Sequence, residues 1–126
     1  MKKIILLVLA VLSAMLMQAQ IYSLAKGKLT NVNDFGNNYI EVTGVFNFVG
    51  SKLKYFYLDY GQDNIGLSPD KITDEKGVEI KLKSTGAMIN YFDKNGWLLI
   101  DTYSFGNASQ AAMRYIFKKK LIKTTQ

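Results

Sequence analysis

Three carboxylates are the first residues to consider for catalysis, because Glu41, Asp59 and Asp101 each fall in a segment with strand-like composition. Two carboxylates on one sheet could act as acid and nucleophile or base in glycan hydrolysis. Their spacing marks no two of them as a pair. The chain has no histidine and no cysteine, so Ser-His-Asp and Cys-His catalysis and zinc sites are excluded within it. We therefore assign no catalytic, cofactor-binding or metal-ligating residue, and keep carboxylate hydrolysis as the alternative interpretation.

Three tyrosines form a second group with chemical potential. Tyr39, Tyr55 and Tyr57 fall on two neighbouring predicted strands at positions that could share the outer face of a sheet. Exposed aromatic rings can stack on sugars or receive a partner protein. An N-terminal segment or a second subunit could equally cover them. We take the three tyrosines as a candidate face for a protein or glycan partner.

Four lysines form a third group near the end of the sequence: Lys118, Lys119, Lys120 and Lys123. The formal net charge is +6, but acidic and basic residues balance between positions 20 and 117. The body of the domain therefore lacks the basic surface of a nucleic-acid-binding protein. The lysines could contact an anionic surface, or they could be a solvated, solubilising segment.

The first residues have the composition of an export signal. Lys2 and Lys3 precede an uncharged apolar run over residues 4–17, which is shorter than the roughly 20 residues of a spanning helix. Ala19 is the small residue that a signal peptidase prefers before its cut. We expect residues 1–19 to be a cleaved signal peptide and residues 20–126 to be one exported domain, with no stable membrane anchor after cleavage. An uncleaved anchor is the alternative.

Alternating and apolar segments predict most of the strands. Residues 39–48 alternate between apolar and polar side chains, and residues 53–60 are rich in strand-forming residues, so the two predict a hairpin. Residues 97–103 and 111–119 predict two further strands, and residues 72–80 a small second hairpin. Residues 20–38 give no clear element beyond a turn cluster at 31–38.

One helix is predicted over about residues 85–95. Ser84 is a suitable N-cap, and the apolar residues that follow form a stripe with helical spacing. Gly96 stands where a left-handed C-terminal cap is needed, and Trp97 is then placed to pack under the helix. The expected fold class is α+β: a mostly antiparallel sheet of 4–6 strands with this helix packed on one face.

The segment from the helix to the last strand resembles a widespread bacterial family of small exported domains of unknown function. The matching residues are Asn95, Gly96 and Trp97, then a strand, a turn, and a final strand closing on Phe117, Lys118 and Lys119, with the triplet at residues 59–61 before the helix. The family usually carries Glu after the Trp, where this chain has Leu98. The resemblance implies a bacterial origin, a fold and an exported location, and it implies no reaction.

Taken together, these patterns predict a small exported bacterial protein of the periplasm or the cell exterior. We expect a non-enzymatic domain that binds a protein or glycan partner, with a small envelope hydrolase as the alternative. No cofactor and no nucleic-acid partner are expected. A homodimer that pairs its sheet edges is a further hypothesis.

Overall fold

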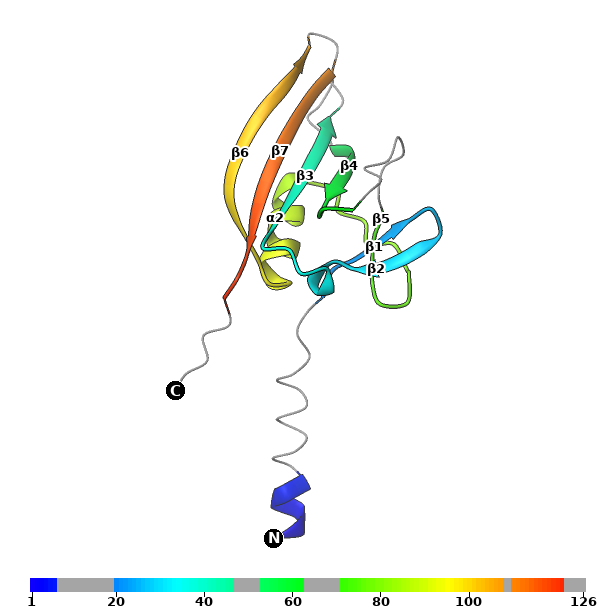
Figure 1. The fold of residues 1–126 in the computed structure, drawn as a ribbon, viewed down its shortest axis with the longest axis vertical. Coiled ribbons are helices and arrows are strands. Elements are labelled where there is room, and N and C mark those ends of the chain that lie inside the picture. Colours follow the sequence, from blue (N-terminus) through cyan, green and yellow to red (C-terminus); the bar gives the residue numbers. More distant parts are fainter. Residues whose placement is uncertain (7–19, 47–52, 63–70, 108–109, 122–126) are drawn as a thin grey trace.

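The computed structural model describes residues 1–6, 20–46, 53–62, 71–107 and 110–121 (Figure 1). Residues 2–6 are helical, and residues 7–19 of the predicted signal peptide lie outside the described residues. In the part of the chain that the structure describes, no helix is long and apolar enough to cross a membrane.

The larger of two sheets has four antiparallel strands in the order β4-β3-β7-β6. Its strands are β3 (Tyr39–Phe46), β4 (Leu53–Asp59), β6 (Trp97–Asn107) and β7 (Gln110–Lys119). All four were predicted, and the β3–β4 hairpin is confirmed. Strand β6 runs past its predicted end at Tyr103, because β6 and β7 stay paired as far as Asn107 and Gln110.

The smaller sheet has the order β2-β1-β5 and contains β1 (Tyr22–Ala25), β2 (Lys28–Asn31) and β5 (Lys71–Thr73). Strands β1 and β2 turn at Lys26 and Gly27, which both have positive φ, as a type I′ hairpin requires. A short 3-10 helix, η1 (Val32–Asp34), follows β2. The predicted hairpin at residues 72–80 is present in a short form: Thr73 bridges Glu79, the Ile80 N–H donates to the Ile72 carbonyl at 2.8 Å, and the Asp74 N–H donates to the Val78 carbonyl at 2.9 Å. The other edge of β5 pairs with β1.

Helix α2 (Thr85–Lys94) begins and ends close to the predicted residues. The Ser84 hydroxyl accepts a hydrogen bond from the Ala87 N–H at 3.1 Å, which confirms the N-cap. Asn95 caps the C-terminus, and Gly96 has φ of +89°, a left-handed conformation that costs glycine little. The chain can therefore reverse directly from α2 into β6.

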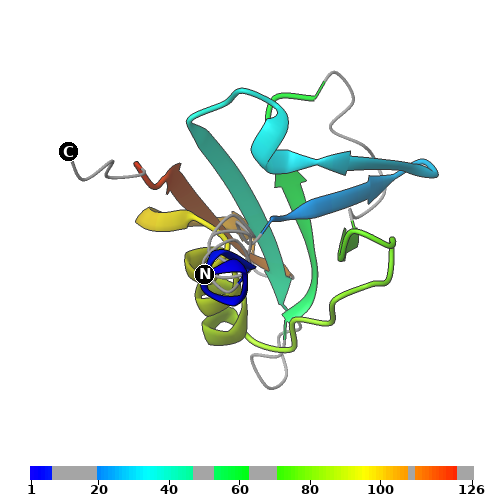
Figure 2. The same cartoon turned by 90° about the horizontal axis from the view of Figure 1, so that it is seen from below.

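One hydrophobic core joins the two sheets and the helix. The inner face of the larger sheet supplies Ile40, Val42, Leu58, Tyr115 and Phe117, and α2 supplies Met88 and Phe92. The same cluster contains Ile72 of β5, Val32 of η1, Ile21 just before β1 and Tyr60 just after β4. Trp97 is fully buried in this core, as predicted. Figures 1 and 2 show α2 beside β6 and β7, with the β1–β2 hairpin near the β3–β4 side. The α+β class is confirmed, with the strands divided between two sheets.

Candidate binding face

The outer face of the larger sheet is the surface that points away from this core. Because side chains alternate along a strand, the neighbours of the buried residues on β3, β4, β6 and β7 face outward. The strand register places them in three rows across the sheet: Leu98, Lys118 and Tyr39; then Asp101, Ile116, Glu41 and Asp59; then Tyr103, Arg114, Thr43 and Tyr57. Acidic, basic and aromatic side chains from distant parts of the sequence thus meet on one surface.

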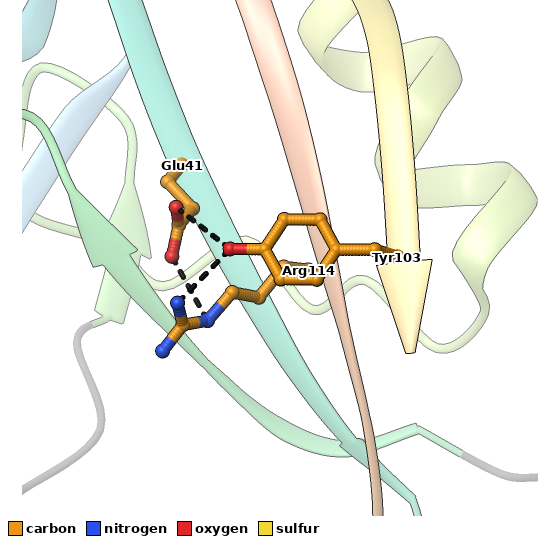
Figure 3. A network of polar contacts seen from close by, with 3 residues as sticks. All are labelled: Glu41, Tyr103 and Arg114. Carbon is orange, nitrogen blue, oxygen red and sulfur yellow. Dashed lines mark hydrogen bonds and ion pairs between the residues drawn. The ribbon is translucent and has the colours of Figure 1, made fainter. Parts of the chain in front are cut away.

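A polar network of three residues lies at the centre of the outer face (Figure 3). Arg114 Nε lies 3.1 Å from Glu41 Oε1, an ion-pair distance, and Arg114 Nη1 donates to the Tyr103 hydroxyl at 2.9 Å. The Tyr103 hydroxyl lies 3.5 Å from Glu41 Oε2 and donates to it weakly. The tyrosine side chain therefore reaches from β6 across β7 towards β3, and the network ties three strands together.

The network favours the charged form of the Arg114 guanidinium at its centre. The hydrogen bond to Tyr103 is the main cause that raises the pKa of Arg114 above its ordinary value, and the nearby carboxylates of Glu41 and Asp59 add to it. Arg114 is thus a permanent cation at all ordinary pH values. Its guanidinium also lies 5.7 Å from the centre of the Tyr103 ring, within the range of a cation–π contact.

Exposed apolar and aromatic residues lie in and beside the network and along β6. Tyr39 is 53% exposed, Leu98 50%, Ile100 48% and Tyr103 40%. Three of them belong to β6, and Tyr39 lies two strands away on β3. Lone exposed apolar residues are common on protein surfaces, but Tyr39 and Leu98 in the row next to a partly exposed arginine and its tyrosine partner make a mixed surface of the kind that proteins use for recognition.

The structure places Tyr39 and Tyr57 on the outer face, on two strands and in different rows. Tyr39 is exposed and sits in the first row, with the Lys118 ammonium 6.0 Å from its ring centre. Tyr57 is half-buried and pairs with Thr43 in the third row, so the row of Glu41 separates it from Tyr39. The backbone of Tyr55 pairs with Val45, and its side chain lies outside the described residues.

Two of the predicted tail lysines are built into the fold. Lys119 donates to the Asn33 carbonyl at 2.7 Å, and its ammonium lies 5.8 Å from the Trp97 ring centre. Lys120 binds both the backbone carbonyl and the carboxylate of Asp93, each at 2.7 Å, at the C-terminal end of α2. Cations are favourable there because the helix dipole is negative at that end.

Lys118 and Lys123 differ from those two lysines. Lys118 is exposed at the rim of the outer face. Lys123 lies outside the described residues. Among the described lysines, Lys119 and Lys120 have hydrogen-bond partners in the fold and Lys118 lies near the Tyr39 ring, and contact of the lysines with an anionic surface stays a prediction.

Two of the three acidic candidates come together in the structure. Glu41 and Asp59 are directly opposite each other on β3 and β4, and Asp101 lies in the same row beyond Ile116. Sequence spacing could not identify this pair, because it depends on strand register. Within the described residues, no group of three or more His, Cys, Asp or Glu side chains could hold a metal ion.

Sequence analysis missed Asn33, which links four parts of the fold. Its Oδ1 accepts from the Ile21 N–H at 3.1 Å and from the Trp97 indole at 3.4 Å. Its Nδ2 donates to the Asn95 carbonyl at 3.3 Å, and its own carbonyl receives Lys119. In the sequence, Asn33 is one of several Asn and Asp residues in a turn cluster, and that pattern signals only a turn.

Comparison with known proteins found no match among family models, curated proteins or solved structures. The resemblance to the bacterial exported family stays a prediction.

Proposed function

We propose that this protein is a non-enzymatic exported domain that binds a polypeptide partner on the outer face of its larger sheet. The observation that supports this function most is the Glu41–Arg114–Tyr103 network, with exposed aromatic and aliphatic side chains beside it. Arginine and tyrosine with apolar neighbours are the residues that dominate binding energy at protein interfaces.

A polypeptide suits this surface better than a glycan. Sugar rings bind by stacking on open aromatic faces. Here a cation lies near two exposed rings of the outer face, Lys118 near Tyr39 and Arg114 near Tyr103. Carboxylates and apolar side chains of a protein complement such cations and their apolar neighbours. The proposed site of action is the periplasm or the cell exterior, after removal of residues 1–19.

Site-specific photo-crosslinking in the producing cell tests this function. A benzophenone side chain at Leu98 reports on the outer face, and the same group at Val78, an exposed residue of the turn after β5, is the matched control. We expect one discrete adduct with another protein from position 98, lost when Arg114→Ala is added. Equal labelling from both positions, no adduct, or retention of the protein by purified envelope glycan instead would overturn the proposal.

The pairing of Glu41 with Asp59 supports one alternative, a small envelope hydrolase. Opposite residues on antiparallel strands have Cβ atoms about 4.5–5.5 Å apart, which suits two cooperating carboxylates. Both groups already serve as acceptors, however: Glu41 binds Arg114, and Asp59 Oδ1 accepts from the Gly61 N–H at 3.0 Å. Turnover of an envelope glycan that Glu41→Gln abolishes would establish the hydrolase and displace the binding function.

A further inference from the structure

Strand β6 carries a second surface, its unpaired edge. The order β4-β3-β7-β6 leaves β6 paired on one side only among the described residues, and it forms the outer edge of the larger sheet in Figure 1. The unpaired backbone N–H and C=O groups of an edge strand are a template for a further strand.

The exposed part of this edge is a run of five residues, 100–104. Every one of them is exposed, so both faces of the strand are in solvent there, whereas Trp97 is buried and Leu99 packs on the core. Strand β6 contains no proline and no lysine, the residues that commonly protect an edge, and Asp101 is its sole charged residue. Two protective features are present. A bulge lies between Leu99 and Asp101, and the Asp101 Oδ1 accepts a hydrogen bond from the Thr102 N–H at 2.8 Å, so pairing at Thr102 requires the Asp101 side chain to turn away.

We propose that β6 of one copy pairs antiparallel with β6 of a second copy, about a two-fold axis at Thr102. Thr102 is the centre of the exposed run, so this register pairs the whole run of each copy. The two larger sheets would then form one continuous eight-stranded sheet, with both outer faces on the same side of it. This pairing is independent of the polypeptide partner proposed above.

Charge favours this register. With Thr102 on the axis, each Asp101 lies opposite Tyr103 of the second copy and does not face its own counterpart, so no like charges are opposed. Asp101 and Tyr103 pair with Ile116 and Arg114 of β7, which places both on the outer face. The Tyr103 side chain reaches away from this edge to Arg114 and Glu41, so the Asp101 carboxylate of one copy faces an uncharged residue of the other.

Cysteine crosslinking tests the register, because the chain has no cysteine of its own. Directly opposite residues in antiparallel strands have Cα atoms about 4.5 or 5.5 Å apart, which lies within disulfide range. In the protein purified from the producing cell, Thr102→Cys should form a disulfide-linked dimer on mild oxidation. Ser104→Cys is the matched control, because it is equally exposed but lies well away from its counterpart in this register.

The mass of the protein in solution completes the test. A pairing of five residues on each side is a small interface, so the dimer should appear by light scattering at submillimolar concentration. Thr102→Lys places two ammonium groups opposite each other on the axis and should restore the monomer mass, with the fold checked by circular dichroism. Equal crosslinking of both cysteine variants, or a monomer mass for the unmodified protein throughout, would overturn the proposal. Crosslinks from Leu98 to other proteins would not bear on it.

Discussion

The two ends of β6 occupy opposite environments. At its start, Trp97 is fully buried beneath α2, and its indole donates to Asn33. A few residues later, the run 100–104 is exposed on both faces, and Tyr103 reaches over the outer face to Arg114. One strand thus joins a part of the molecule that holds the fold together to a part that is free for contact with other molecules.

This difference separates stability from recognition within one element. Burial of a large aromatic side chain dominates the free energy of folding, whereas exposed polar pairs contribute little to it. We therefore expect substitutions at the buried end to unfold the protein and substitutions at the exposed end to leave it folded.

The largest effect is expected for Trp97→Ala. Removing a buried tryptophan leaves a cavity and removes one of the two hydrogen bonds that Asn33 Oδ1 accepts, so the free energy of unfolding should fall by about 3–5 kcal/mol. Tyr103→Ala on the same strand should lower it by less than about 1 kcal/mol, since the side chain is exposed. Urea denaturation followed by circular dichroism measures both. Similar losses for the two variants would remove the distinction between the ends of β6.

A smaller loss of unfolding free energy is expected for Asn33→Ala, which tests whether Asn33 stabilises the buried end of β6. The variant leaves Ile21 N–H, the Trp97 indole and the Asn95 carbonyl without their partner, at a cost of about 1–3 kcal/mol. Asn38→Ala is the control, because Asn38 is exposed and its contact with Lys119 is made by its backbone carbonyl. Equal unfolding midpoints for the two variants would show that Asn33 does not link the fold.

At the exposed end, Glu41→Gln should change the free energy of unfolding by less than about 1 kcal/mol, because the ion pair with Arg114 is partly exposed. Its effect should shrink further in high salt. The same variant should weaken the photo-crosslink from Leu98 strongly if the network forms the binding face. A stability loss comparable to that of Asn33→Ala would instead make the network part of the structural core.

The smallest effect is a pH dependence at Tyr91 on α2. Burial, and then the charge of Asp74, raise the pKa of Tyr91 above its ordinary value of 10.0. As the pH rises above 10.0, Tyr91 of the unfolded chain loses its phenolic proton before Tyr91 of the folded chain does. The native state therefore loses stability as the pH rises through the pKa of the folded state. The stabilising contribution is fully present at lower pH. Tyr91→Phe should therefore lose less stability than the natural protein at strongly alkaline pH, and identical alkaline profiles would contradict this.

Local patterns sufficed for elements whose determinants lie close together in the sequence. Ser84, the apolar stripe after it and Gly96 define α2 within a few residues of each other, and the structure confirms them. The smaller sheet was not predicted, because β1 and β2 are four residues each and β1 pairs with β5, far along the chain. Propensity over such short segments is too weak to identify a strand.

The candidate site was predictable only in part, for the same reason. Alternation identified the outward positions of β3, including Tyr39 and Glu41, but not their neighbours on β7. Arg114 and Tyr103 meet Glu41 through strand order and register, which the sequence pattern does not contain. Lys119 and Lys120 appeared to belong to a basic tail, and their partners Asn33 and Asp93 are likewise distant in sequence.

The pairing of β3 with β7 also dictates when the fold can form. The strands β3 and β4 can form a hairpin early, but their apolar face stays uncovered until β7, the last described element, reaches β3. A pairing between such distant segments is slow to nucleate, because a long loop must close first. A newly made chain would therefore lack the pairing at the centre of its larger sheet until β7 has been synthesised.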